Sequence, residues 1–269
     1  SYGKKPEQFV NRLYGMGLNQ RLGIEIKGEG QPDIKYTDSE LWSGLSLPWM
    51  SIGYEVRLTP LQILALYNAV ANDGTMIKPI FVEELRSHGK TVRRFRAEVL
   101  NHQICSRETL EHMKVMLEGV VTEGTARNLA NTHYRIAGKT GTAQVSLSKE
   151  GYTQELYQAS FVGYFPSDAP RYSCMVVVNA PSKSIYYGNL VAGPIFREIT
   201  DRIYVREFDL HRGRDILTRR IEEAPYSKSG SSEALKKTFS YLGLQVRQGE
   251  WQTPWVSTRS TEEGIELYP

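Results

Sequence analysis

Residues 136–144 read Ile-Ala-Gly-Lys-Thr-Gly-Thr-Ala-Gln and hold the chain's densest set of chemically useful groups. A strand that lines a cleft can place the Lys139 cation along one wall. The hydroxyls of Thr140 and Thr142 would donate hydrogen bonds. Gly141 would leave the backbone between these hydroxyls without a side chain. An ordinary exposed edge strand could also carry Lys-Thr-Gly, so the surrounding residues decide between these readings.

Hydrophobic patterning predicts the elements that must position this strand. Strands are expected at 134–145, 159–165 and 172–179, and the apolar run Cys174–Val178 predicts burial of the last on both faces. Helices are expected at 6–18, from Pro60 to Asn72, from Ser106 to about Val120, and from Ile195 to about Val205 after Gly193-Pro194. A long loop is expected at 28–48, and a hairpin at 76–96 that turns at Ser87-His88-Gly89. This order predicts an α/β chain of the α+β type, with an antiparallel sheet flanked by helices.

Composition excludes several classes of function. The chain has 269 residues, and its net charge of +3, from 33 basic and 30 acidic residues, gives no nucleic-acid footprint. No apolar run approaches the roughly 18 residues of a membrane helix, and no signal peptide is visible, so any anchor is expected outside this chain. The histidines lack metal-ligand spacing, so neither a metal nor a cofactor is predicted. Cys105 and Cys174 are expected to be free thiols rather than a disulfide, and a nucleophilic role for Cys105 is not favoured.

The chain changes character after Glu207. Residues 1–206 are expected to form the main domain, and 207–231 a polar linker that includes a Ser/Gly/Lys run. Residues 232–246 predict a short helix that ends at Gly243 and is followed by a strand. Residues 232–269 are therefore expected to begin a small C-terminal module.

Five segments, in order, resemble class B penicillin-binding proteins, the peptidoglycan transpeptidases of bacterial division and elongation. They are Ser51-Ile52-Gly53-Tyr54 with Leu58-Thr59-Pro60-Leu61-Gln62; Ala71-Asn72-Asp73-Gly74 leading to Lys78-Pro79; Val120-Val121 with Gly124-Thr125-Ala126; Lys139-Thr140-Gly141-Thr142-Ala143; and Phe161-Val162-Gly163-Tyr164-Phe165-Pro166. Tyr187-Gly188-Asn189 ahead of Ala192-Gly193-Pro194 resembles the family's closing strand–helix junction. The division-type subgroup fits better, although Glu55 stands where that family often has glycine.

The resemblance implies a penicillin-binding-protein and β-lactamase-like fold, and acyl transfer through an active-site serine. It implies catalytic roles for Lys139 and Thr142, with the Thr142 N–H as an oxyanion donor. Substrate contacts would come from Thr140, Gly141, Thr142, Ala143 and Gln144. The implied ligands are peptidoglycan stem peptides and β-lactams, without a cofactor, and the implied partners are cell-division and cell-wall synthesis proteins. The implied location is the extracytoplasmic face of the membrane, through an N-terminal anchor that this chain does not include.

The family's serine motifs, S-x-x-K and S-x-N, are not found in a suitable place. Ser87-His88-Gly89-Lys90 falls on the expected hairpin tip, and Ser146-Leu147-Ser148-Lys149 falls in a polar loop. Tyr187-Gly188-Asn189 matches a Y-x-N variant only formally. We therefore expect a C-terminal fragment that lacks the nucleophile. In the family, earlier strands lie beside the equivalent of 172–179, so that edge is expected to be open in this chain and covered by another chain or segment.

Two alternatives stay open. One is a β-lactam sensor or hydrolase of the same superfamily, whose acyl-enzyme would have a different fate. The other is a non-catalytic muropeptide-binding module, because Glu233–Val246 faintly resembles the start of a PASTA-type repeat. The proline-rich opening of such a repeat is absent.

Overall fold

In a computed structural model of the protein, the described residues are 2–145, 156–181, 185–207, 210, 229–249, 253–261 and 264–269. They belong to two compact units, residues 1–210 and 211–269. Ser146–Lys149, one of the two S-x-x-K matches, lies outside the described residues, and so does most of the expected linker.

The centre of the first unit is a three-stranded antiparallel sheet in the order β7-β8-β9. Its strands are β7 (Ala137–Val145), β8 (Leu156–Phe165) and β9 (Tyr172–Asn179). All three predicted strands are confirmed. Lys139 lies opposite Val162 and Thr142 opposite Ala159. Among the described residues β8 is the only strand that pairs with β7, so the other edge of β7 carries no described strand.

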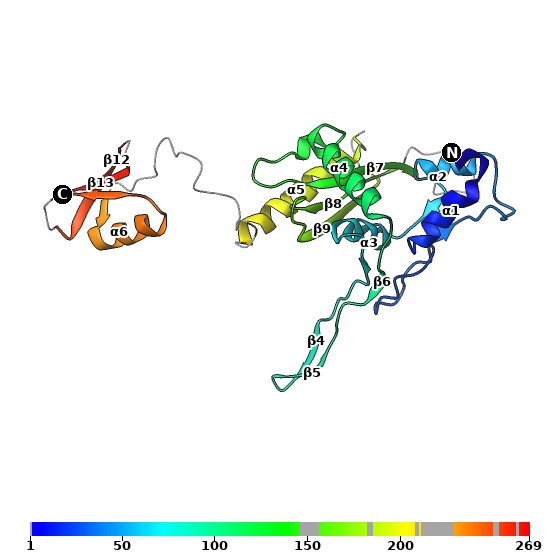
Figure 1. The fold of residues 1–269 in the computed structure, drawn as a ribbon, viewed down its shortest axis with the longest axis horizontal. Coiled ribbons are helices and arrows are strands. Elements are labelled where there is room, and N and C mark those ends of the chain that lie inside the picture. The colour runs from blue at the N-terminus through cyan, green and yellow to red at the C-terminus, as the bar shows by residue number, and fades with distance from the viewer. Residues whose placement is uncertain are drawn as a thin grey trace. The chain divides into compact units, whose positions relative to one another are not determined.

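Helices cover both faces of this sheet (Figure 1). Side chains alternate along β8, so Phe161 and Phe165 pack towards α5 (Gly188–Arg206), while Tyr164 packs towards α3 and α4. The helices on that second face are α3 (Pro60–Ala71) and α4 (Arg107–Thr122). The two helices begin where the sequence predicts. Thr59 caps α3 through a reciprocal bond with Gln62, and Ser106 caps α4.

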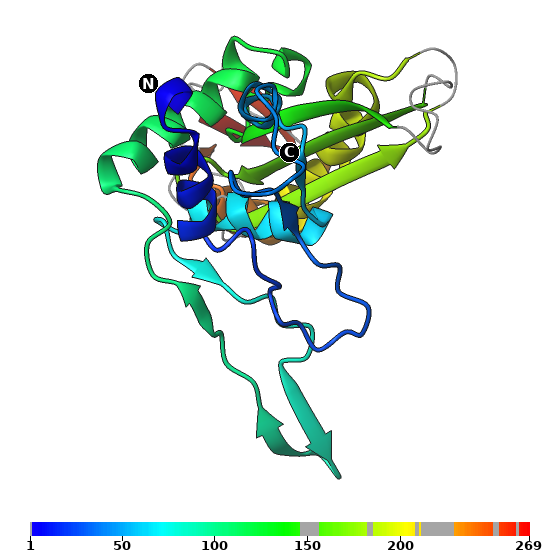
Figure 2. The ribbon, with the colours of Figure 1, turned by 90° about the vertical axis from the view of Figure 1, so that its right-hand side faces the viewer.

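Shorter elements surround this core. They are η1 (Tyr2–Lys4), α1 (Pro6–Gly15), α2 (Ser46–Ser51), η2 (Arg127–Leu129), the pair β1 (Asp33–Ile34) and β2 (Val56–Arg57), the pair β3 (Met76–Ile77) and β6 (Val99–Asn101), and the hairpin β4 (Glu84–Ser87) and β5 (Lys90–Arg94). The hairpin projects away from the sheet in both views (Figures 1 and 2). The expected hairpin at 76–96 is thus two separate pairings, and the loop expected at 28–48 contains β1 and the start of α2.

Two further sequence predictions are wrong in detail. The last helix begins at Gly188 and not at Ile195, so Pro194 lies inside it. The start of α5 is set by packing, because a Cβ at Gly188 would clash with the carbonyl of Ser160 on β8. Strand β9 is half-buried rather than buried on both faces, because it is an outer strand of the described sheet. Cover over that edge by another chain stays a prediction.

The second unit has its own sheet and core. Its strands are β10 (Ser229–Ser231), β11 (Val246–Gln248), β12 (Trp255–Thr261) and β13 (Gly264–Tyr268), in the order β10-β12-β13-β11, and its helix is α6 (Ser232–Tyr241). Phe239 of α6 packs on Val256, Ile265 and Leu267. The helix-then-strand prediction for 232–246 is confirmed. Among the described residues of the whole chain, no helix is both long and apolar enough to span a membrane.

Candidate active site

One edge of β7 faces away from the sheet, and two contacts show which backbone groups point there. The Gln144 N–H donates to the Tyr54 hydroxyl at 3.4 Å. The Thr140 carbonyl accepts a hydrogen bond from Lys139 Nζ at 2.9 Å. Backbone groups of alternate residues point to the same edge of a strand, so the N–H and C=O of Thr142 point there too. A peptide could add to this edge as a further strand, with the Thr142 N–H facing it.

Lys139 brings positive charge to that edge. Its side chain is exposed, and its ammonium bonds to Thr140 O and lies 3.5 Å from Thr140 Oγ1. Within the described ranges, no carboxylate forms an ion pair with it. An ammonium held by a neutral carbonyl keeps its charge available for an incoming anion.

The two threonine hydroxyls lie on the α5 side of the sheet and are oriented by different neighbours. Thr140 Oγ1 lies 3.0 Å from Thr125 Oγ1, in the segment that follows α4. Thr142 Oγ1 accepts a hydrogen bond from the Gly188 N–H, at the start of α5, at 3.1 Å. An accepting hydroxyl keeps its own hydrogen, so Thr142 can still donate to an anion.

Glycines allow this close packing. A Cβ at Gly141 would clash with the Ser160 side chain, and a Cβ at Gly188 would clash with the backbone of both Gly141 and Ser160. The beginning of α5 therefore lies directly on β7 and β8. Thr125 and Gly188 were not predicted to belong to the site. Their membership of two family-like segments was the only signal in the sequence.

The far end of the edge carries an aromatic pair. Tyr54 packs edge-to-face against Trp49 of α2, with ring centroids 5.2 Å apart, and caps the Gln144 N–H. Ala143 and Gln144, both expected to contact substrate, lie in this half of β7 and are half-buried. No role was predicted for Tyr54, and its place in a family-like segment was again the only signal in the sequence.

The look-alike motifs lie elsewhere. Ser87 and Lys90 pair across the two-residue turn of the β4–β5 hairpin, whose tip points away from β7 (Figure 1). The Ser87 hydroxyl contacts only the His88 ring, at 3.0 Å, among the hydrogen bonds of the described chain. Asn189 bonds to Asn128, at the junction rather than on the free edge. The described residues hold no cluster of three or more metal-ligating side chains.

Comparison with known proteins identifies the family. The penicillin binding protein transpeptidase domain matches residues 4–201. The chain is 33% identical over 196 residues to stage V sporulation protein D of Bacillus subtilis, covering 72% of this chain and 30% of that protein. It is 30% identical over 191 residues to the peptidoglycan D,D-transpeptidase FtsI of Buchnera aphidicola, covering 71% of this chain and 31% of FtsI.

Solved structures agree with this assignment. The transpeptidase domain of Burkholderia pseudomallei penicillin-binding protein 3 matches with a TM-score of 0.62 and 28% identity, over 75% of this chain and 58% of that one. Penicillin-binding protein 3 of Mycobacterium tuberculosis, solved with ampicillin, matches with a TM-score of 0.65 and 28% identity, over 75% and 46%. This chain spans about a third of the length of the curated relatives it matches. The chain belongs to the penicillin-binding-protein transpeptidase family.

Proposed function

We propose that this chain is part of a peptidoglycan D,D-transpeptidase that cross-links the cell wall during division. The observation that carries the proposal is the free edge of β7, where the Lys139 ammonium and the outward Thr142 N–H lie together in a chain of this family. Relatives of this chain are named peptidoglycan D,D-transpeptidases.

The proposed reaction is acyl transfer in two steps. A serine oxygen attacks the penultimate D-Ala carbonyl of a stem peptide, the C–N bond breaks, and D-Ala leaves with a proton on its nitrogen. The amine of a second stem peptide then attacks the acyl ester, forms the cross-link and returns the proton to serine. In both steps negative charge develops on the carbonyl oxygen, where an N–H donor lowers the barrier.

The residues of β7 would divide this work. The Thr142 N–H would donate to the oxyanion, and the Lys139 ammonium with the Thr140 and Thr142 hydroxyls would hold the terminal carboxylate of the substrate. Gly141 would let the substrate backbone approach. Ala143 and Gln144 would contact the part of the substrate that precedes the scissile bond.

We propose that the nucleophilic serine lies outside this 269-residue sequence. The exposed hairpin tip gives Ser87 no contact that could activate it apart from one histidine ring, and the free edge of β7 holds no serine. The chain alone would then be inactive. From the family match we also propose an extracytoplasmic protein that is anchored by a segment outside this sequence and meets other cell-wall synthesis proteins there.

A fluorescent penicillin tests the proposal. The complete protein is expected to label covalently and to hold the label for many minutes, while the 269-residue chain is not. Ser87→Ala in the complete protein should label like wild type. Rapid release of the label as hydrolysed penicillin would identify a β-lactamase of the same superfamily instead. Labelling of the 269-residue chain, lost in Ser87→Ala, would overturn the proposed place of the serine.

We also propose that residues 232–269 are an accessory muropeptide-binding module of the PASTA type. Support comes from its separate core around Phe239 and from the helix-then-strand order. Binding of a soluble muropeptide to the chain with and without residues 229–269 tests this. Equal binding by both would contradict it.

A further inference from the structure

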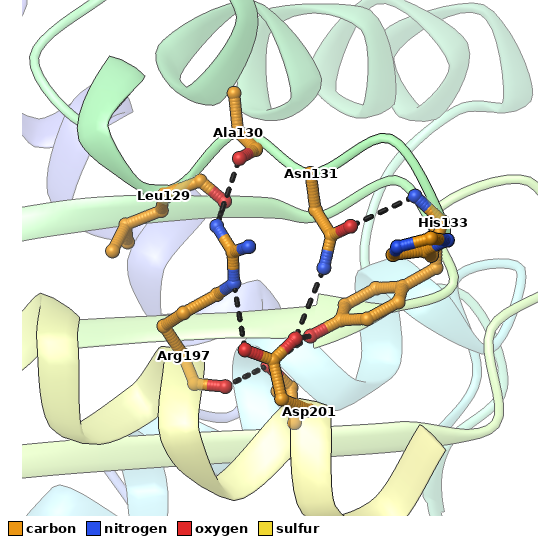
Figure 3. Close-up of polar contacts among 8 residues, drawn as sticks. Leu129, Ala130, Asn131, His133, Arg197 and Asp201 are labelled. Atoms are coloured by element: carbon orange, nitrogen blue, oxygen red, sulfur yellow. Dashed lines mark hydrogen bonds and ion pairs between the residues drawn. The ribbon is translucent and has the colours of Figure 1, made fainter. Parts of the chain in front are cut away.

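The Arg197 side chain, on α5, bonds to the chain segment that links α4 to β7 (Figure 3). Its Nη1 donates to the carbonyls of Leu129, at 3.1 Å, and Ala130, at 2.8 Å. Its Nε donates to Asp201 Oδ2 at 3.0 Å, one helical turn further on. A planar guanidinium can meet carbonyls and a carboxylate at once, which an ammonium cannot do with the same geometry.

Asp201 holds the other end of the same segment. Its Oδ1 accepts from Asn131 Nδ2 at 3.0 Å and from the Tyr134 hydroxyl at 2.6 Å. Tyr134 is buried, and desolvation together with Asp201 raises its pKa to about 12, so it stays a donor. Arg197 and Asp201 together form what we call the α5 clamp, which holds residues 129–134 against the helix.

Both parts that the clamp joins touch the candidate active site. The segment carries Thr125, whose hydroxyl contacts Thr140. The helix begins at Gly188, whose N–H bonds to Thr142. Asn128 of the segment also donates to the Asn189 carbonyl, at 2.8 Å. The orientation of the two threonine hydroxyls therefore depends on how the segment sits on the helix.

We propose that Arg197 and Asp201 are positioning residues, which set the orientation of the Thr140 and Thr142 hydroxyls by fixing residues 124–134 to α5. The inference rests on the proposed function, because it concerns the hydroxyls that would hold the substrate carboxylate. The clamp acts at a distance, since among the described residues the hydrogen bonds of Arg197 and Asp201 go to residues 129–134 and not to β7. Buried Leu129, which packs on Gly193, keeps the segment folded when the clamp is weakened.

The test compares two acyl donors in the complete protein, one with a free terminal carboxylate and one with that carboxylate amidated. The ratio of their acylation rates measures how well the hydroxyls hold the anion. Asp201→Asn should lower this ratio about tenfold, the effect of losing roughly one charged hydrogen bond. The melting temperature should fall only slightly, and the rate with the amidated donor should stay near that of wild type.

Glu198→Gln is the matched control. Glu198 pairs with Arg202 at the same helical spacing, but this pair is exposed and does not contact residues 124–134. Its ratio should equal that of wild type. Arg197→Lys, which keeps the charge but not the fork, should lower the ratio less than Asp201→Asn does, and it serves if Asp201→Asn fails to fold.

The outcomes separate the inference from the function on which it rests. A wild-type ratio in both folded clamp variants would overturn the positioning role. A ratio near one in the wild-type protein, with no advantage from the carboxylate, would contradict the proposed function itself. An equal loss of rate with both donors would indicate a merely structural role and would also overturn the inference.

Discussion

The Gly188 N–H donates to Thr142 Oγ1 at 3.1 Å, which ties the first residue of α5 to the strand that carries Lys139. This bond occupies the acceptor side of the hydroxyl and leaves its hydrogen for another group. Only glycine fits at this position, because a Cβ at residue 188 would clash with the backbone of β7 and β8. This close contact sets where α5 begins.

Thr142→Val should therefore have two effects. It leaves the N–H of the buried residue Gly188 without an acceptor, which should lower the free energy of unfolding by about 1–2 kcal/mol. It should also slow acylation of the complete protein by β-lactams by about tenfold, because one carboxylate donor is lost while the backbone N–H survives. Thr142→Ser keeps the hydroxyl and is the control. Equal effects of Val and Ser would show that the hydroxyl is not used.

Tyr54→Phe tests which backbone groups face the free edge. The Tyr54 hydroxyl accepts from the Gln144 N–H, so its removal should speed hydrogen exchange of that amide roughly tenfold, as expected for loss of about 1.4 kcal/mol. Exchange at Gly141, whose N–H points towards β8, should not change. Unaltered exchange at Gln144 would mean that β7 presents its other backbone groups to the edge.

Glu55 adopts a left-handed backbone conformation, with φ of 57°, at the position where the family often has glycine. Its carboxylate forms a half-buried ion pair with Lys35 at 3.3 Å. Glu55→Ala loses the pair and keeps the strained backbone, whereas Glu55→Gly loses the pair and relieves it. The glycine variant should therefore be more stable than the alanine variant by about 1 kcal/mol in urea unfolding. The reverse order would contradict the strain.

The pair of Asp73 and Lys114 predicts a pH dependence. A hydrogen bond and charge attraction from Lys114, at 2.7 Å, lower the pKa of Asp73 below its ordinary value of 3.8. A carboxyl whose pKa is lower in the folded state stabilises the fold above its unfolded pKa, and this stability is lost as pH falls through the folded pKa.

Asp73→Asn removes this charge and keeps a residue that tolerates the positive φ of 51° at this position. Because the carboxylate is exposed, solvent limits the effect to about 0.5 kcal/mol near neutral pH. The difference between wild type and variant should close as pH falls below 3.8, the ordinary pKa of the carboxyl, and it should shrink in high salt. A difference that persists in acid would show that the ion pair is not its source.

Much of the core was predictable from local patterns. Pro60 after Thr59 predicts the start of α3, and the apolar run Phe161–Phe165 predicts β8. The start of α5 was not predictable, because Gly193-Pro194 reads as a helix start while contact with the backbone of Ser160 fixes the helix at Gly188. Local sequence does not contain that contact.

The candidate site divides in the same way. The Lys139-Thr140-Gly141 run is visible in the sequence because its residue types are contiguous. The groups that orient it, such as Thr125 and Tyr54, come from segments 15 and 90 residues away in the chain. Only the fold brings them to β7, so their roles could not follow from spacing.

The most direct measurement is the rate constant for acylation of the complete protein by a β-lactam, compared between wild type and Lys139→Ala. Loss of the edge ammonium should slow acylation by about 100-fold or more, since one such group typically contributes about 2–4 kcal/mol to the transition state. Lys90→Ala, on the hairpin tip, is the control and should react like wild type. Unchanged acylation in Lys139→Ala, or a large loss in Lys90→Ala, would contradict the assignment of β7 as a wall of the active site.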